Sequence, residues 1–333
     1  MTVNREIHLA ARPVGEPGAE NFELVATALP ELAEGQVLVR NTWMSVDPYM
    51  RKRMHDTDSY LPLFQLGAPL DGSAIGEVVA SRSADIPVGA TVVHFLGWRE
   101  YAVVDAAAVT VADLALAPAE AWLGALGPTG LTAYVALTHV APVREGDVVF
   151  VSAAAGAVGS VAGQLARELG ASRVIGSAGG TLKAKKLVQD FGYDAAIDYH
   201  AGSLAGQLAE VAPEGIDVYV DHVGGDHLVA AIDALRHGGR IAMVGAISSY
   251  NATEPVPGPS NLFTLAAKDA TLRGMLINSY LHLFPEWIAK AAGWLADGSL
   301  HTELTVAEGI ERAPAAFLDM MRGGNVGKML VRL

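Results

Sequence analysis

The sequence predicts two folded domains of different classes, an all-β domain and a doubly wound α/β domain. Three observations support this. The chain has 333 residues, enough for two ordinary domains. Short apolar runs separated by Gly and Pro fill residues 9–111, and from about residue 121 apolar strand patterns alternate with helical ones. Hydrophobic residues make up 51% of the chain and charged residues 18%, so both domains can build a core and disorder is not expected.

The first part of the chain is typical of a β domain. Apolar or alternating runs lie at residues 36–46, 74–81, 90–95 and 100–105, with turn sequences such as DIPVGA between them. The carboxyl-terminal KMLVRL also alternates, and we expect it to form a strand that returns to this domain. We therefore predict a β domain over residues 1–125 that residues 298–333 complete.

The middle of the chain is typical of a parallel sheet covered on both faces. Amphipathic helical patterns connect the apolar strand patterns DVVFVS, RVIGSA, AAIDY, IDVYVD and RIAMVG. Buried strands joined in this way form a parallel sheet, and right-handed crossovers make that sheet doubly wound. We predict a Rossmann domain over residues 126–297.

Charge and cysteine content exclude several classes of protein. The net charge of −13 disfavours nucleic acid and anionic membranes as partners, because both bind basic surfaces. The dense basic run RKRMH, residues 51–55, is expected to be a solvated loop. Without cysteine, no disulfide, thiolate nucleophile or Cys-ligated zinc is possible. We expect a cytoplasmic protein, because the sequence shows neither a signal peptide nor a run of about 18 apolar residues.

A glycine-containing turn, AAAGAVG, follows a buried strand and begins a helix; it contains Gly156, Ala157, Val158 and Gly159. Glycines in such a turn let the backbone approach a pyrophosphate, and the helix N-terminus adds N–H groups and a positive dipole end. The alternative is a tight turn without a ligand. The complete strand–turn–helix context favours a dinucleotide site.

The end of the second strand predicts which dinucleotide binds. NAD sites place a carboxylate there for the ribose 2′-hydroxyl. Here the sequence RVIGSAGGTLKAKK brings no carboxylate before Asp190, and Lys183, Lys185 and Lys186 come instead. A cation favours a 2′-phosphate, so NADPH/NADP+ is the predicted cofactor. The three lysines share one helix, and about one of them is expected to face the ribose.

Two other chemistries fit the sequence less well. The stretch DHVGGDH, residues 221–227, resembles a metal cluster, but its spacing matches no known ligand set. A βα turn at the switch point of a parallel sheet explains it better, so no metal is predicted. The serines that flank the glycine turn do not lie in a G-x-S-x-G motif, which argues against a serine hydrolase.

Motifs spread over nearly the whole chain resemble those of a known family. They are VDPYMR, LGALGPTGLTAY, VSAAAGAVGSVAGQLA, GSAGGTLK, AAIDYH, VGAISSYN and GNVGKMLV, in this order. The sequence resembles the zinc-free medium-chain dehydrogenases/reductases, in particular the leukotriene B4 dehydrogenase/prostaglandin reductase and alkenal double-bond reductase group with its curcumin-reductase-like members. The resemblance implies a GroES-like β domain beside the Rossmann domain, and NADPH as cofactor.

The resemblance also implies roles for individual residues. The cofactor-binding set consists of the glycine turn with Gly179, Lys183, Tyr199, His222, Ser249, Tyr250 and Asn325. Within it, Lys183 matches the lysine that binds the 2′-phosphate, and Ser249 and Tyr250 match residues beside the nicotinamide ribose. Tyr49 and Tyr60 match tyrosines that line the substrate pocket. Two departures concern substrate preference: His222 stands where the family commonly has Asn, and GPTG replaces GMPG or GMTG.

The chemistry expected of such a site needs no metal. When hydride adds to the β-carbon of an α,β-unsaturated ketone or aldehyde, charge develops on the carbonyl oxygen, and a hydrogen-bond donor there stabilises the enolate. Tyrosine donates while neutral, because its ordinary pKa is about 10. Tyr250 is the first candidate for this catalytic donor, and Tyr49 and Tyr60 are the next. The proton for the α-carbon comes from one of them or from water.

The sequence leaves two other functions open: a zinc-free NADPH:quinone reductase and a non-catalytic NADPH-binding protein. The expected ligand besides NADPH is a small hydrophobic enone or alkenal. A homodimer is also expected, as is common in the family, and residues 270–277 are the candidate edge strand for its interface. An apolar edge strand left exposed invites aggregation.

Overall fold

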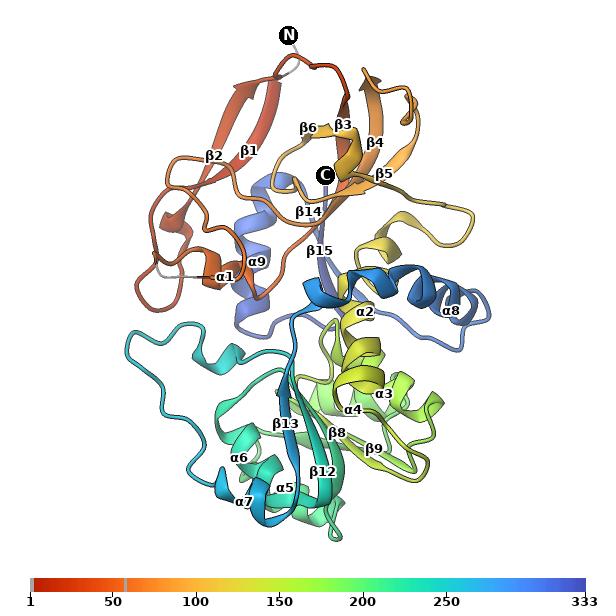
Figure 1. The fold of residues 1–333 in the computed structure, drawn as a ribbon. Coiled ribbons are helices and arrows are strands. Elements are labelled where there is room, and N and C mark those ends of the chain that lie inside the picture. The colour runs from red at the N-terminus through yellow and green to blue at the C-terminus, as the bar shows by residue number, and fades with distance from the viewer. Residues whose placement is uncertain (1–2, 57–58) are drawn as a thin grey trace. The chain divides into compact units, whose positions relative to one another are not determined.

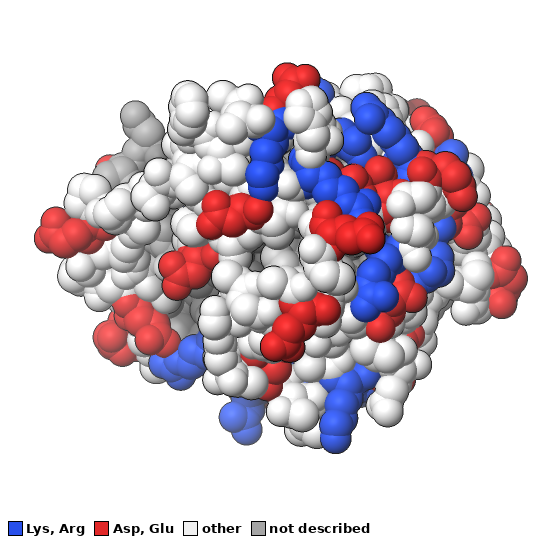
Figure 2. Space-filling model, turned by 90° about the horizontal axis from the view of Figure 1, so that it is seen from below, with Lys and Arg blue, Asp and Glu red and all other residues white. Residues whose placement is uncertain are grey.

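The computed structural model describes residues 3–56 and 59–333. The chain divides into two compact units, one of Met1–Gly124 with Leu304–Leu333 and one of Ala125–Glu303. Both are drawn in Figure 1. No helix among the described residues has the length and apolar character needed to span a membrane. On the face drawn in Figure 2, basic side chains lie among acidic ones.

The first unit, Met1–Gly124 with Leu304–Leu333, is built on mainly antiparallel strands, with β14 and β15 parallel, which confirms the predicted GroES-like β domain. A larger sheet has the order β14-β15-β3-β4-β5-β7, with β6 on β3, and β1 pairs with β2. β15 pairs antiparallel with β3, so the carboxyl-terminal strand joins this sheet. The strands are β1 Val3–Leu9, β2 Phe22–Ala28, β3 Gln36–Ser45, β4 Ala74–Ser81, β5 Thr91–His94, β6 Tyr101–Asp105, β7 Thr110–Val111, β14 Leu304–Glu308 and β15 Lys328–Arg332.

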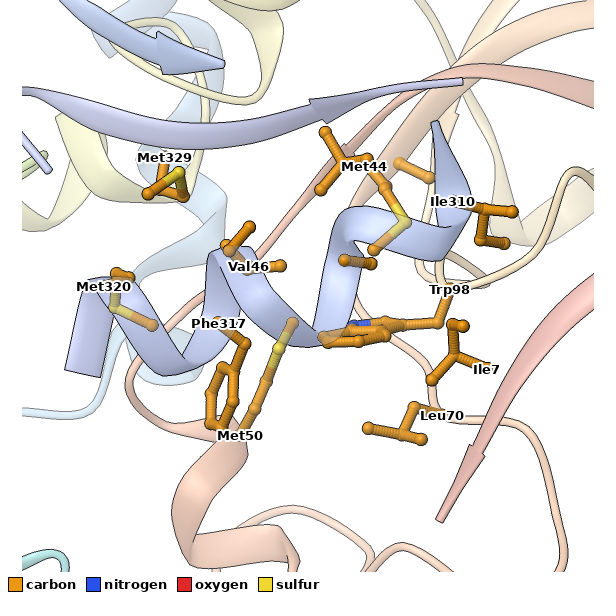
Figure 3. Packing of buried hydrophobic residues seen from close by; sticks show 14 of the residues in the cluster. Ile7, Met44, Val46, Met50, Leu70, Trp98, Ile310, Phe317, Met320 and Met329 are labelled. Atoms are coloured by element: carbon orange, nitrogen blue, oxygen red, sulfur yellow. The ribbon is translucent and has the colours of Figure 1, made fainter. Parts of the chain in front are cut away.

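Helices of the first unit pack on this framework. They are α1 Met50–Arg53, α9 Ala313–Met321 and the 3₁₀ turns η1 Ala19–Asn21, η2 Ala106–Ala108, η3 Ala119–Trp122 and η7 Ile310–Arg312. Figure 3 shows Phe317 and Met320 projecting from α9 into a cluster that contains Met50 and Trp98. The Phe317 and Trp98 rings meet edge to face, with centroids 6.3 Å apart. Burial of such large aromatic side chains dominates the energetics of a core.

The basic run RKRMH is not a solvated loop, so that expectation is wrong. Its first residues form α1, and the side chains of Arg51 and Arg53 are buried. Arg53 forms an ion pair with Asp71 and lies over the ring of Phe64, 4.0 Å from its centroid. Arg51 Nη2 donates to the carbonyl of Gly15 at 2.7 Å. A guanidinium tolerates burial when its donors are satisfied, and here the acceptors lie too far along the chain for a local pattern to indicate them.

The second unit, Ala125–Glu303, confirms the predicted doubly wound domain. Its sheet has the order β10-β9-β8-β11-β12-β13, and every neighbouring pair is parallel. This is the strand order of the Rossmann fold. Successive strands are added on one side of β8 as far as β10, and the next strand, β11, lies on the other side of β8. The strands are β8 Val148–Val151, β9 Arg173–Ala178, β10 Ala195–Asp198, β11 Ile216–Asp221, β12 Leu235–Met243 and β13 Thr271–Gly274.

Helices connect these strands, precede the first of them or follow the last. They are α2 Pro128–Val135, α3 Gly159–Glu168, α4 Thr181–Gln189, α5 Leu204–Val211, α6 Gly225–Ala234, α7 Phe263–Ala267 and α8 Phe284–Ala296, with the short helices η4 Ala136–Val140, η5 Ile247–Ser249 and η6 Ile277–Leu283. All four residues of β8 are buried, as expected for a central strand covered on both faces. At α5, the Ser203 hydroxyl caps the helix by accepting from the N–H of Gly206 at 3.2 Å.

Candidate cofactor and active site

The glycine turn lies between β8 and α3, at the carboxyl end of the sheet. Gly156 N–H donates to the carbonyl of Ala153 at 3.0 Å, and α3 begins at Gly159. A Cβ on Gly159 would lie 2.6 Å from both the Ala153 oxygen and the Ala154 Cα. Only glycine therefore lets the helix start this close to the turn. The Ser160 N–H already donates to the Gly156 carbonyl at 2.9 Å, so the N–H groups before it, where the turn enters the helix, are the ones that fit a pyrophosphate.

His222 lies at the switch point of the sheet, between β8 and β11, where the order in which strands are added reverses. It follows β11, and Ser152 follows the neighbouring strand β8. The His222 main-chain N–H donates to Ser152 Oγ at 2.9 Å, and ring atom Nδ1 is 2.7 Å from the Ser152 carbonyl oxygen. A carbonyl only accepts, so Nδ1 carries the proton. Burial lowers the pKa of His222, which keeps the ring neutral.

The other ring nitrogen of His222 is an unused hydrogen-bond acceptor. Nε2 is buried and has no partner among the residues that the structure describes. Ligands of open α/β sheets bind outside the carboxyl ends of the strands at this switch point. A buried acceptor there fits a donor group of a dinucleotide, so we place His222 in the candidate site.

Tyr250 lies in the segment that follows a different strand, and its hydroxyl is close to Gly245. It follows β12 through η5, and its hydroxyl oxygen is 3.5 Å from the N–H of Ala246. A Cβ on Gly245 would lie 3.3 Å from the Tyr250 oxygen and 3.4 Å from the His222 carbonyl oxygen. Burial raises the pKa of Tyr250 above its ordinary value, so the phenol stays protonated. Ser249, its neighbour, donates its hydroxyl to the Ala246 carbonyl at 2.8 Å.

A second part of the site lies at the turn after β9. The hydroxyl of Tyr199, which follows β10, is 2.7 Å from the position of a Cβ on Gly179. Lys183 is in the first turns of α4, which begins at Thr181. Of the three lysines considered for the 2′-phosphate, Lys186 is engaged elsewhere. Its Nζ donates to Glu303 at 2.8 Å and pairs with Asp190 at 3.3 Å.

The structure adds a carboxylate to this turn that the sequence reasoning missed. Asp198 ends β10 and lies opposite Ala178, the last residue of β9, in the parallel register. Its Oδ1 accepts from the N–H of Gly180 at 2.9 Å, and its Oδ2 accepts from Thr181 Oγ1 at 3.2 Å. The prediction considered only the residues that directly follow β9 in the sequence. Asp198 ends the neighbouring strand, and parallel strands end at the same edge of a sheet, so the aspartate in AAIDY could have indicated this carboxylate.

The remaining predicted residues belong to the first unit. Tyr49 immediately precedes α1, and its ring stacks on Phe95 with centroids 6.4 Å apart. Its hydroxyl is buried without a partner among the described residues, and burial raises its pKa well above the ordinary value. Tyr60 is 52% exposed. Asn325 precedes β15 and donates its side-chain N–H to the Gly327 carbonyl at 2.8 Å.

The stretch DHVGGDH does not gather its side chains as a metal site would. Asp221 Oδ1 accepts from the N–H groups of Val223 and Gly224, at 3.0 Å and 2.8 Å, so it shapes the turn into α6. His227 packs against the edge of Tyr199, with ring centroids 5.2 Å apart. Within residues 3–56 and 59–333, no group of three or more His, Cys, Asp or Glu side chains is arranged to hold a metal ion.

Known proteins resemble this chain over its whole length. Two family models match, one described as the N-terminal domain of oxidoreductase over residues 5–112 and one described as zinc-binding dehydrogenase over residues 157–296. The chain is 37% identical to the NADPH-dependent curcumin reductase of Escherichia coli, with 99% of this chain and 97% of that protein covered. It is 35% identical to the NADP(+)-dependent 2-alkenal reductase of Nicotiana tabacum, with 98% and 97% covered. Among solved structures, CurA from Vibrio vulnificus in complex with NADPH matches with a TM-score of 0.92 and 38% identity, and 98% of each chain is covered.

Proposed function

Because the chain belongs to the zinc-free medium-chain dehydrogenase/reductase family, we propose that it is an NADPH-dependent reductase of the C=C bond in α,β-unsaturated ketones and aldehydes. The observation that carries this proposal is the protonated phenol of Tyr250, whose oxygen lies against Gly245, as does the main-chain carbonyl of His222, beyond the carboxyl ends of β12 and β11. The relatives named curcumin reductase and 2-alkenal reductase support the same substrate class.

The cofactor is NADPH, and residues of the Rossmann unit fit it. The glycine turn offers the N–H groups at the entry to α3 to the pyrophosphate, and Nε2 of His222, which has no partner among the described residues, offers an acceptor. Lys183 supplies a cation for the 2′-phosphate, beside Gly179 and Tyr199. When bound, NADPH supplies the hydride for the β-carbon. Asn325 is proposed as a further cofactor contact.

Tyr250 is proposed to act on the carbonyl oxygen of the substrate. As negative charge develops on that oxygen, a hydrogen bond from a neutral phenol stabilises the enolate without a metal. Tyr49, whose buried hydroxyl has no partner among the described residues, is the next candidate for this role. Tyr49 and Tyr60 are otherwise proposed to contact the substrate. The proton that ends on the α-carbon comes from a tyrosine or from water.

A substrate panel tests the proposal. The purified protein would be incubated with NADPH and a conjugated enone, an alkenal, a small quinone or a saturated alcohol, and loss of NADPH absorbance would be followed. We expect turnover of the enone and alkenal, with mass spectrometry showing two added hydrogens and a retained carbonyl. Turnover of quinones alone would favour the quinone reductase, and tight NADPH binding without any turnover would favour the non-catalytic protein.

Lys183→Ala is expected to raise KM for NADPH by about tenfold and to leave KM for NADH unchanged. A hydrogen bond to a charged group contributes about 1.5–3 kcal/mol, and solvent reduces that value at a partly exposed site. Lys185→Ala is the matched control, since Lys185 lies on the same helix and is exposed. An equal rise of KM for NADH, which lacks the 2′-phosphate, would show that Lys183 does not bind that phosphate.

We also propose a homodimer and a cytoplasmic location. β13 is one of the two edge strands of the six-stranded sheet and lies within the segment 270–277, and Leu276 beyond it is 37% exposed. An edge strand offers unpaired N–H and C=O groups to a second copy of the chain. Light scattering coupled to size exclusion would measure the mass, and a monomer at micromolar concentration would contradict the dimer.

A further inference from the structure

We propose that Asp198 limits the preference of this enzyme for NADPH over NADH. The inference rests on the proposed function for the cofactor but not for the substrate. In a Rossmann domain, the ribose 2′ position lies at the end of the second strand, and a carboxylate there accepts from the 2′-hydroxyl of NAD. Here the second strand is β9, and the carboxylate comes from β10.

The position of Asp198 is fixed by contacts within this turn. Asp198 pairs in register with Ala178, so its side chain starts level with the end of β9. Oδ1 accepts from the N–H of Gly180 at 2.9 Å and from the N–H of His200 at 3.0 Å. The flanking residue Tyr199 has its hydroxyl at Gly179, 2.7 Å from the Cβ position there. The carboxylate is therefore held at the turn after β9, next in sequence to Tyr199, which is predicted to bind the cofactor.

The chemistry of this carboxylate favours a hydroxyl over a phosphate. Hydrogen bonds from Gly180, His200 and Thr181 lower the pKa of Asp198, so it is an anion at neutral pH. An ionised carboxylate has about four lone-pair sites, and the three donors leave one for a ribose hydroxyl. A 2′-phosphate brings a second anion to the same turn, and the two repel each other.

Lys183 and Asp198 thus have opposite effects on the affinity for the 2′-phosphate. The lysine on α4 attracts the 2′-phosphate and so favours NADPH, whereas the carboxylate opposes it. Thr181, whose hydroxyl donates to Asp198, begins the same helix, so both charges act at one helix end. We therefore infer that the enzyme prefers NADPH, but by a smaller factor than Lys183 alone would give. NADH should then also serve as a hydride donor.

Asp198→Asn tests this inference through binding of nucleotide fragments. Calorimetry at pH 8 would compare 2′,5′-ADP with 5′-AMP, which lacks the 2′-phosphate. We expect Kd for 2′,5′-ADP to fall by about five- to tenfold at low ionic strength and by less at 0.5 M salt, because salt screens the repulsion. Kd for 5′-AMP should stay the same or rise. The ratio of kcat/KM for NADPH to that for NADH should increase by a similar factor.

Two further variants keep the test decisive. Asp190→Asn removes the same charge from the other end of α4 and should leave both fragment affinities unchanged. Asp198→Ser also removes the charge while keeping a small hydroxyl at this position, and serves if the Asn variant unfolds. Unchanged or weaker binding of 2′,5′-ADP by a folded Asp198 variant would overturn the inference. Because fragment binding needs no enone, failure of the proposed reductase activity would appear separately, in the substrate panel.

Discussion

Tyr250→Phe is expected to lower kcat for a conjugated enone by about 100-fold, the usual cost of losing one donor to a developing oxyanion, while NADPH binding is nearly retained. The substitution removes only the hydroxyl, whose oxygen lies by Gly245 and near the Ala246 N–H, and it keeps the aromatic ring. Stopped-flow measurement of NADPH oxidation would give kcat, and quenching of protein fluorescence would give the Kd of NADPH.

Tyr280→Phe is the matched control for this variant. Tyr280 lies in η6, and its hydroxyl accepts from Arg273 Nη2 at 3.0 Å, so it should tolerate loss of the hydroxyl without loss of turnover. Full turnover by Tyr250→Phe would remove Tyr250 from the mechanism and direct attention to Tyr49.

The pH dependence of the unmodified enzyme gives a second check on Tyr250. A phenol donates only while protonated, so the contribution of Tyr250 is present below its pKa and is lost as the pH rises through it. Burial raises that pKa above the ordinary value of about 10. We therefore expect kcat to show no alkaline fall below about pH 10. A decline centred near pH 8 would indicate a different donor.

Gly159→Ala is expected to destabilise the Rossmann unit and to weaken NADPH binding strongly. The new Cβ would meet the backbone of Ala153 and Ala154 at 2.6 Å, and backbone cannot swing aside as a flexible side chain does. Overpacking of this kind costs about 1–3 kcal/mol, which lowers Tm by several degrees. The same shift moves the start of α3 away from the turn that is proposed to bind the pyrophosphate.

Gly293→Ala is the control for this prediction. Gly293 lies in α8, is exposed, and a Cβ there meets nothing within 4 Å. Alanine should stabilise this helix by up to about 1 kcal/mol. Calorimetric unfolding of the two variants would separate the effects, and an unchanged Tm for Gly159→Ala would show that the turn relaxes at little cost.

Local patterns in the sequence were sufficient for much of this fold. The alternation of buried strands with helices predicts the parallel sheet, and the glycine turn predicts where α3 meets β8. Both properties depend on neighbours within a few residues, such as the close approach of Gly159 to Ala153. The roles of Tyr49, Lys183 and the other site residues remain predictions, because they depend on a bound cofactor and substrate.

The sequence by itself determined the order of the elements, the class of both domains and the position of the dinucleotide turn, because periodicity and backbone space act over short stretches of chain. Only the tertiary structure decided that Arg53 is buried against Asp71, that the Tyr250 hydroxyl and the His222 carbonyl both lie against Gly245, and that Asp198 accepts from the turn after β9. Each of these depends on strand register or on a partner many residues away, and no local pattern records either one.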